Sequence, residues 1–477
     1  MTWTLTLQAR DEENQPQTLR FSLGRYMDEA DNFYDPRIQQ PGLYEAGLYA
    51  GQLLQQSRSG YGETTLINVD GGLDYLADYA VDGREMVLAL DGVPQVVGTV
   101  ARLAFSDDEV SVVLRDPLEP LRSPHPMQTY AGDNVLPDGL EGTKDDIAGE
   151  HKPLVFGEVR NAQPVQVNTA KLIYQVSSLA DCTIQAVYDR GVALDNGGAY
   201  TSLAQLQSTA PVKGTFRAYQ GYVRLGDNAT GTLTVDAEQA DPRAGAIAQA
   251  LAAARGYTLH ADDVATLNTY GAVRVYLTTQ TNTLELLDRI AESIAGFLTV
   301  QPGQQLRLGI WEAPEPTADA IHDYAIATIS RSATGAGEGG LPVWRVTLEC
   351  DRIETVQPDL QSNVSEARRA RLARQTRRVV ATDDTVRDRH PLAGEITINS
   401  VLASYSQSEA VAARVLALLG VRRDTVTVEA IETLLPTVGG NLTLITPRLG
   451  YTEGRAMRVT GYRLNAQTDE LSLNLWG

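Results

Sequence analysis

Few residues of this 477-residue chain have the types and spacing that metal binding or catalysis requires. Cys182 and Cys350 are the only cysteines, 168 positions apart, which excludes a CxxC metal cluster and a disulfide framework. We expect two buried free thiols, with a pairing in space as the alternative. The histidines show no HxH or HExxH spacing; they are His125, His151, His260, His322 and His390.

Two runs of adjacent carboxylates could in principle serve acid–base chemistry, namely 107–109 (Asp-Asp-Glu) and Asp383-Asp384. Neighbours on a strand point to opposite faces, so these runs do not make a catalytic pair and are interpreted as turn residues. A two-carboxylate glycosidase stays open, because its pair need not be close in sequence. No Walker loop, GxGxxG before a helix or GxSxG elbow is present. We therefore predict no catalytic, cofactor-binding or metal-binding residue, no cofactor, and no enzyme activity.

The overall charge argues against a nucleic-acid binder. The chain carries 60 acidic and 40 basic residues, a formal net charge of −20, whereas phosphate contacts need clustered Lys and Arg. The simple interpretation of this acidic charge is that it keeps the protein soluble. The more specific interpretation is that acidic side chains line a channel and repel DNA from its wall. One stretch departs from this balance: residues 365–378 contain six arginines, which either contact DNA or an acidic partner, or pair with the protein's own acidic surface.

The beginning of the chain has no basic and apolar leader, and no stretch reaches the roughly 20 apolar residues that span a bilayer. We expect no membrane insertion, and synthesis and folding in a cytoplasm.

The elements that would position any site are mainly strands. Residues 1–23 alternate apolar and polar side chains around a polar turn, as a β-hairpin does, and 151–240 carries short strands at about 8–12-residue spacing. Residues 24–60 look like a loop excursion that contacts partners. Helices are predicted after Pro242, from Asn282 or Thr283 to Gly296, and over 409–420.

These patterns predict a multidomain chain that is mainly β with α+β insertions. It would contain two similar β-barrel domains, a β module and a small α+β module. The predicted ranges are 1–118 for the first barrel, 119–240 for the inserted β domain, 241–315 for the small α+β domain and 316–477 for the second barrel.

A repeat supports the idea of two similar domains. Residues 99–114 (TVARLAFSDDEVSVVL) and 460–475 (TGYRLNAQTDELSLNL) align without a gap and match at seven of sixteen positions. The matches are Thr99/Thr460, Arg102/Arg463, Leu103/Leu464, Asp108/Asp469, Glu109/Glu470, Ser111/Ser472 and Leu114/Leu475. A β-unit carried twice, hundreds of residues apart, favours a ring-building structural part over an enzyme.

Several motifs resemble those of tail-tip baseplate hub proteins of long-tailed, siphovirus-type bacteriophages. They are PLVFGEVRNAQPV from Pro153, IQAVYDRGVAL from Ile184, the helix and hairpin NTLELLDRIAESIAGFLTVQPGQQLRLG from Asn282, and the segments RHPLAGEITINS, LLGVRRDTVTVE, VGGNLTLITPRLG and LNLWG. The resemblance extends over most of the chain from about residue 60 onward and rests on the order and number of these motifs.

The resemblance implies a homotrimer in the virion, at the tail tip. Two barrels per subunit would form a pseudo-sixfold ring that connects the hexameric distal tail ring to the central tail fibre. Tape measure protein and then DNA would pass through the channel without specific binding, and the accessory domains would contact other baseplate proteins. A receptor-binding tail fibre or adhesin module is the alternative, and a cell-wall-degrading tail enzyme a weaker one.

Overall fold

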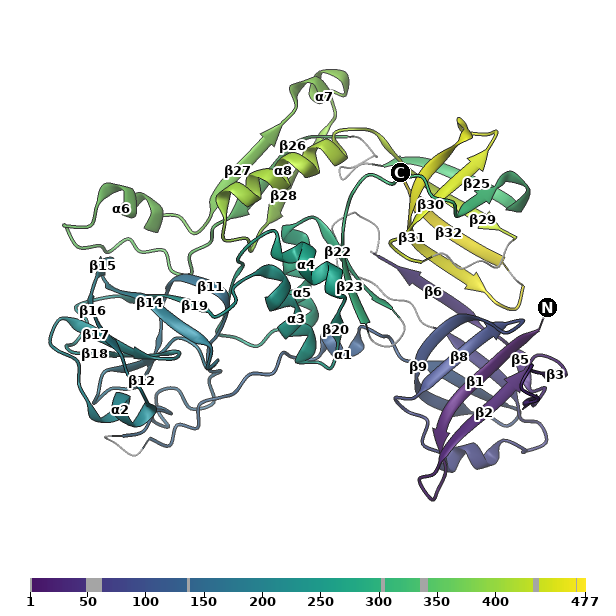
Figure 1. The fold of residues 1–477 in the computed structure, drawn as a ribbon, viewed down its shortest axis with the longest axis horizontal. Coiled ribbons are helices and arrows are strands. Elements are labelled where there is room, and N and C mark those ends of the chain that lie inside the picture. Colours follow the sequence, from purple (N-terminus) through teal and green to yellow (C-terminus); the bar gives the residue numbers. More distant parts are fainter. Residues whose placement is uncertain are drawn as a thin grey trace.

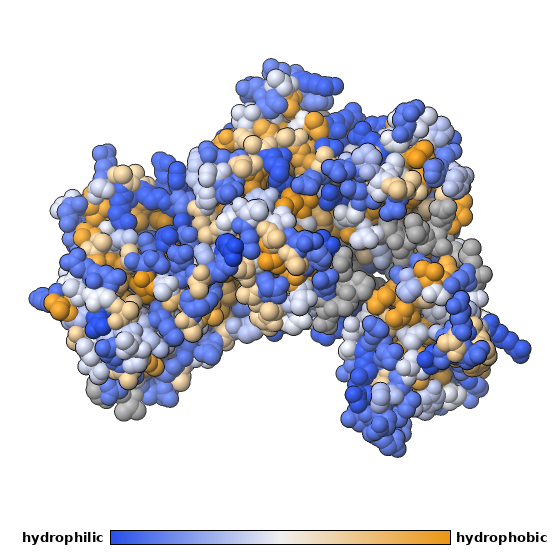
Figure 2. Space-filling model, in the orientation of Figure 1, coloured by the Kyte–Doolittle hydropathy of each residue, from blue (hydrophilic) through white to orange (hydrophobic). Residues whose placement is uncertain are grey.

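The computed structural model describes residues 2–48, 62–134, 138–301, 305–334, 342–431, 437–468 and 470–477. The chain is mainly β, as the sequence predicts, and its strands form several sheets. Figure 1 shows an elongated molecule with β lobes at both ends and the longer helices between them. Figure 2 shows a mixed, largely hydrophilic surface on this face. Within the described ranges, no helix is long and apolar enough to cross a membrane.

The first seven-stranded sheet has the order β2-β1-β8-β9-β10-β7-β5. The predicted N-terminal hairpin is confirmed, because β1 and β2 pair antiparallel with Leu7 opposite Leu19. A β-bridge between Phe21 and Asp35 brings the β2 edge to the segment that leads into β5, so the sheet curls toward closure. Its elements, with the adjoining small hairpin, are β1 (Trp3–Arg10), β2 (Pro16–Ser22), β3 (Tyr26–Met27), β4 (Phe33–Tyr34), β5 (Ile38–Gln40), β7 (Glu63–Ile67), η1 (Asp74–Asp78), β8 (Glu85–Leu90), β9 (Val93–Phe105) and β10 (Glu109–Leu114).

The second seven-stranded sheet has the order β24-β30-β31-β32-β29-β25, and β6 also pairs with β31. Its two edge strands, β24 and β25, are joined only by residues 323–325, which span roughly 14 Å at most. The edges therefore lie close together and this sheet too is strongly curled. Its elements are β6 (Leu43–Gly47), β24 (Ala320–His322), η2 (Asp323–Ala325), β25 (Ile326–Thr334), β29 (Arg423–Ala430), β30 (Asn441–Thr446), β31 (Tyr451–Asn465) and β32 (Glu470–Trp476).

The two sheets share one strand order. Apart from β2 and β6, each sheet has six strands, and numbering these in chain order gives 1-4-5-6-3-2 across both sheets. One pairing differs in direction, because β1 is antiparallel to β8 whereas β24 is parallel to β30. A single hydrophobic core contains buried side chains of both sheets, so the sheets pack side by side.

The inserted β region forms two five-stranded sheets that enclose a separate core. The predicted series of short strands is confirmed. The elements are β11 (Leu154–Ala162), β12 (Val165–Asn168), β13 (Ile173–Gln175), β14 (Cys182–Asp189), β15 (Val192–Ala193), β16 (Asp195–Ala199), α2 (Leu203–Ser208), β17 (Thr215–Tyr219), β18 (Tyr222–Leu225) and β19 (Leu233–Gln239).

The central α+β region contains the predicted amphipathic helix α5. Asn282 caps this helix, accepting a hydrogen bond from Glu285 N at 2.7 Å, and the helix ends at Ser293, three residues before the predicted stop. Its apolar face is buried. The elements are α1 (Glu119–Arg122), α3 (Ala244–Ala253), β20 (Thr258–Leu259), α4 (Ala261–Asn268), β21 (Arg274–Leu277), α5 (Thr283–Ser293), β22 (Gly296–Gln301) and β23 (Gln305–Ile310).

Residues 343–419 build a further three-stranded sheet, β27-β26-β28, covered by helix α8. Its buried side chains belong to the same core as α3 and α5, not to the core of the seven-stranded sheets. Helix α8 includes the predicted helix 409–420 but begins earlier, because Ser404 caps it. The elements are β26 (Val343–Cys350), α6 (Glu366–Leu372), β27 (Arg377–Thr382), α7 (Asp384–Arg389), β28 (Gly394–Asn399) and α8 (Tyr405–Leu419).

The four predicted domain ranges stay a prediction, and two strands cross their boundaries. Strand β6, from the first range, lies in the second seven-stranded sheet, and β21, from the third range, completes a sheet of the inserted β region. Within 316–477, only residues 320–334 and 423–476 supply strands to the second seven-stranded sheet.

Candidate assembly surface

The two repeated segments fold into the same piece of structure, one hairpin in each seven-stranded sheet. Residues 99–114 cover the end of β9 and β10, and residues 460–475 cover the end of β31 and β32. The matched apolar side chains on the second strand are buried in both copies, namely Val110, Val112, Leu114, Leu471, Leu473 and Leu475. The repeat therefore marks equivalent positions in two sheets of equal strand order.

The cross-strand register of the two hairpins differs by two residues. Leu103 lies opposite Val112 in the first hairpin, whereas its match Leu464 lies opposite Leu471 in the second. Because side chains alternate between faces with a period of two, this shift keeps every side chain on its face. The sequence match is thus preserved while the pairing changes. Asp469, the match of Asp108, lies outside the described residues.

A strand from the beginning of the chain joins the two sheets. β6 runs antiparallel to the second half of β31, with Leu43 opposite Asn465 and Gly47 opposite Gly461. Figure 1 shows β6 reaching from the first lobe to the edge of the second. The interpretation of 24–60 as a loop is wrong for β6 and for the shorter strands β3, β4 and β5, and residues 49–60 lie outside the described residues. The five residues of β6, LYEAG, carry too short an alternation of apolar and polar side chains to be recognised as a strand.

Tyr44 connects β6 to the first sheet. Its side chain is 3% exposed in the core that both sheets share. The hydroxyl lies 2.7 Å from Thr64 Oγ1 of β7 and 2.9 Å from Pro41 O. Burial raises the pKa of the Tyr44 hydroxyl far above its usual range, so the group stays protonated and able to donate. One residue thus ties a strand of the second sheet to a strand of the first.

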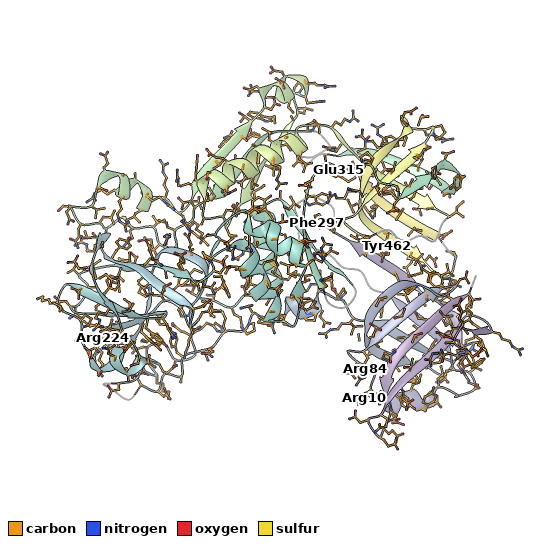
Figure 3. All side chains as sticks on the ribbon, in the orientation of Figure 1. Arg10, Arg84, Arg224, Phe297, Glu315 and Tyr462 are labelled. Atoms are coloured by element: carbon orange, nitrogen blue, oxygen red, sulfur yellow. The ribbon has the colours of Figure 1, made fainter. Side chains whose placement is uncertain are left out.

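The second sheet also packs against the central α+β region through aromatic side chains. Trp476 of β32 contacts Trp311 edge-to-face with centroids 5.3 Å apart, and Trp311 contacts Phe297 at 5.2 Å. Figure 3 shows Phe297 on the side of the central region that faces this sheet, with Tyr462 of β31 across the junction. The curled sheets are therefore fixed to the centre as well as to each other.

Gly461 lets β6 approach β31, because a Cβ at this position would lie 2.8 Å from Ala46 O. We expect Gly461→Val to detach β6 and to lower the free energy of unfolding by about 1–3 kcal/mol. Hydrogen exchange over 43–47 should become faster. The control is Gly24→Val, where an added Cβ meets nothing within 4 Å and exchange should not change. Unchanged protection of β6 in Gly461→Val would contradict this account.

The two cysteines considered for chemistry lie inside hydrophobic cores. Cys182 and Cys350 are buried free thiols, as predicted, and they belong to different cores. Burial raises the pKa of both thiols, that of Cys182 to about 12, so neither is a ready nucleophile. Among the described residues, no group of three or more His, Cys, Asp and Glu is placed to hold a metal ion.

The carboxylate runs lie at chain reversals and helix starts. Asp107 and Asp108 stand at the turn between β9 and β10, as predicted, whereas Glu109 is the first residue of β10. Asp383 is the N-cap of α7, accepting from Thr385 N at 3.0 Å, and Asp384 pairs with Arg387 at 3.0 Å. The first run is therefore part of the repeated hairpin, and the second run starts a helix.

Of the five histidines, all of which the structure describes, His125 is the buried one. Its ring Nδ1 lies 3.0 Å from Thr283 Oγ1 at the start of α5, and its backbone N–H donates to Thr281 O at 2.6 Å. Burial, with the Arg255 cation as a smaller cause, lowers the pKa of His125 to about 4. The imidazole is therefore neutral in the folded protein at pH 5, whereas in the unfolded chain it is protonated.

This difference predicts a loss of stability in mild acid. Between pH 6.5 and 4 the unfolded state binds more protons at His125 than the folded state does, so stability falls as the pH falls. Across this pH range, protonation of His125 in the unfolded chain lowers the free energy of unfolding by about 3 kcal/mol in total. Urea unfolding at pH 7 and 5.5 should show a smaller pH dependence in His125→Asn than in the natural protein. An equal dependence would contradict the assignment to His125, and exposed His322→Asn should leave it unchanged.

The arginine-rich stretch turns largely toward the protein itself. Arg368 stacks on Tyr188 with its guanidinium carbon 3.8 Å from the ring centroid, and its Nε donates to Gly191 O at 2.9 Å. Arg378 pairs with Glu349 at 2.8 Å. Among the described contacts, the stretch therefore supports pairing with the protein's own surface, which was one of the two interpretations.

Asp351 gathers further arginines into a cluster that the sequence did not reveal. Arg274 of β21, with its side chain 9% exposed, binds both Asp351 and Glu158 of β11. Arg371 and Arg377 approach Asp351 at 3.5 and 3.6 Å. The cluster connects the inserted β region, the central region and the 343–419 sheet. No spacing along the chain links residues so far apart, so only the fold brings them together.

No family model matches this chain, and no curated protein is similar to it in sequence. Solved structures align with this chain over nearly its whole length, at low identity. The tail protein from Neisseria meningitidis MC58 has 11% identity and a TM-score of 0.46, covering 100% of this chain and 96% of that one. The 43 kDa tail protein of prophage MuSo2 from Shewanella oneidensis has 9% identity and a TM-score of 0.43, covering 99% and 98%. The prophage tail protein gp18 from Listeria monocytogenes has 8% identity and a TM-score of 0.41, covering 100% and 94%. All three are tail proteins, and two of them are from prophages.

Proposed function

We propose that this chain is a structural hub at the tip of a long bacteriophage tail, without enzymatic activity. Each subunit would contribute two similar β-barrels to a homotrimeric ring. The observation that carries the proposal is the shared strand order of two seven-stranded sheets packed side by side in one chain. The motifs that resemble tail-tip hub proteins lie in both the inserted and the C-terminal parts, and they support the same role.

Two related sheets per subunit would allow a trimer to match a six-fold ring. A six-fold ring presents the same patch six times, and a plain trimer can match only three of them. Two related sheets per subunit supply six similar surfaces from three chains. Such a ring would join the hexameric distal tail ring on one side to a three-fold central fibre on the other, and the remaining regions would contact other baseplate proteins.

The junction between the sheets supports this role, because a pseudo-sixfold ring needs neighbouring barrels at a fixed rotation of about 60°. β6 extends the second sheet with a strand from the first part of the chain, and Tyr44 hydrogen-bonds that strand to β7. Because β6 belongs to the same chain as the first sheet and pairs with the second, it fixes the angle between the two sheets more firmly than a surface contact would. Separation of β6 from β31 would also disturb the contact of Tyr44 with the first sheet.

The net charge of −20 suits a channel that DNA crosses. If acidic side chains line the ring, phosphates meet repulsion and slide past without specific binding. The tape measure protein would occupy the same channel before ejection. The protein would thus reside in the virion, at the tail tip.

Electron microscopy of the purified full chain tests the proposal directly. We expect hollow particles with three-fold symmetry and a mass of about 155 kDa, three times the 51.7 kDa of one chain. Mass measurement over a range of protein concentrations gives the copy number independently. A monomer at all concentrations, or a closed ring of another copy number, would refute the hub assignment.

A further inference from the structure

A pocket opens in the first lobe, where the segment before β5 meets the loop after β7. It is an open, shallow hollow of about 430 Å³, lined by Asp35, Pro36, Arg37, Ile67, Val69 and Asp70. Figure 1 shows β5 and β3 on the side of this lobe that faces away from the central helices. The pocket is therefore separate from β6 and from the contacts that hold the lobes together.

Apolar side chains stand exposed at this pocket. Val69 is 69% exposed and Ile67 38%, and both line it. Tyr75, 44% exposed, lies close enough to Asp35 and Arg37 for their charges to act on it. Phe33, 61% exposed, precedes Asp35 by two residues, about 7 Å along the chain. Grouped exposure of large apolar side chains marks protein-interaction sites.

The charge at the pocket is negative. Arg37, its only cation among the lining residues, is engaged by two carboxylates, with Nε 2.9 Å from Asp35 and Nη1 2.7 Å from Asp70. Two negative charges against one positive leave a net charge of −1 at the pocket, and both carboxylates remain partly exposed at 43% and 62%. This balance disfavours nucleic acid, and it disfavours a second copy of this acidic chain.

The small hairpin beside the pocket is rigidly built and carries more apolar surface. Met27 lies opposite Phe33, and Met27 is 57% exposed. The turn between them is held by Asp28, whose carboxylate accepts from Asn32 N at 2.8 Å. An ordered turn that presents Met and Phe to solvent adds anchoring surface next to the pocket, because both residue types are enriched in protein interfaces.

We infer that this pocket and hairpin form a docking site for a segment of a partner protein that carries an apolar side chain flanked by Lys or Arg. The apolar side chain would enter between Val69 and Ile67, and the flanking cations would face Asp35 and Asp70. The inference goes beyond the proposed hub function and does not depend on it, because it concerns a surface away from the shared core of the two sheets.

Labelled synthetic peptides test the site on the full chain by fluorescence anisotropy. A peptide Lys-Leu-Lys-Leu-Lys should bind, and binding should weaken about tenfold in Val69→Ser, which removes one apolar contact. Val212→Ser, an equally exposed valine in the inserted β region, should bind as the natural protein does. Peptides Glu-Leu-Glu-Leu-Glu and Lys-Ser-Lys-Ser-Lys should bind at least tenfold more weakly.

Hydrogen exchange locates the contact. Added Lys-Leu-Lys-Leu-Lys should protect residues 26–38 and 66–75, where the hairpin and the pocket lie. Protection elsewhere, equal binding of the acidic peptide, equal binding to Val69→Ser, or no binding at 1 mM would each overturn the inference. Because Val69 is exposed, its replacement should leave the melting temperature unchanged, so a folding defect cannot imitate the expected loss.

Discussion

Replacing Tyr44 by alanine is expected to lower the free energy of unfolding by about 3–5 kcal/mol, the usual cost of removing a buried aromatic side chain. The ring is 3% exposed, within the core that both curled sheets share. The substitution also leaves Thr64 Oγ1 of β7 without its partner at 2.7 Å. Urea unfolding should show the loss, and hydrogen exchange should show β6 opening before either sheet does.

Two variants separate packing from hydrogen bonding. Tyr44→Phe keeps the ring and loses only the hydroxyl contacts, so it should cost about 1 kcal/mol. Tyr324→Ala removes a tyrosine that is 77% exposed, and it should stay within about 0.5 kcal/mol of the natural protein. A Tyr44→Ala protein as stable as Tyr324→Ala would disprove the role of Tyr44 as a tie between the sheets.

Combination with Gly461→Val makes the test sharper. Both substitutions act on the same strand pairing. The double variant should therefore lose less unfolding free energy than the sum of the two single losses, by about 0.5 kcal/mol or more. If the hub proposal holds, Tyr44→Ala subunits should also form fewer rings at a given concentration, because the angle between the two sheets is no longer fixed. If Tyr44→Ala lowers stability but rings form normally, Tyr44 stabilises the fold and has no part in ring assembly.

The N-terminal hairpin of the first curled sheet and the repeated hairpin of each sheet were predictable, and the separation of the two copies in sequence was not an obstacle. Strands β5, β6, β24 and β25 were not predicted. Alternation of apolar and polar side chains marks a strand wherever one face is buried. The repeat located the equivalent hairpins, because burial selects the same apolar positions in both copies even where the register shifts by two. These strands are predictable because the residues that are buried are the same residues that form the apolar positions of the local pattern.

Three features could not be predicted because no local pattern encodes them. β6 is a strand only because β31 offers an open edge to it. Residues 343–419 carry ordinary strand and helix patterns, and nothing in those patterns states that their core is shared with α3 and α5. Asp351 gives no signal at all, since its partners lie on strands and a helix from distant parts of the chain.

Removing the Asp351 carboxylate should be the second large effect. Asp351→Ala leaves the side chain of Arg274, 9% exposed, with Glu158 as its remaining ion-pair partner, and it also withdraws the anion from Arg371 and Arg377. Loss of one partner from a buried ion pair typically costs about 3–5 kcal/mol. We expect a loss of this size in urea unfolding, with faster exchange in β21 and β27.

A matched pair of variants distinguishes charge from backbone strain at this position. Asp351 has a φ of 51°, a left-handed conformation that asparagine tolerates and alanine does not. Asp351→Asn removes the charge without that strain, so most of the loss should remain if the ion pairs are its cause. Asp91 has a similar φ of 47° and is exposed, so Asp91→Asn should change stability by less than about 0.5 kcal/mol. If Asp351→Asn is equally harmless, the arginine cluster does not hold these three regions together. The contacts of Arg368 with Tyr188 and Gly191 then become the stronger candidate for joining the inserted β region to residues 343–419.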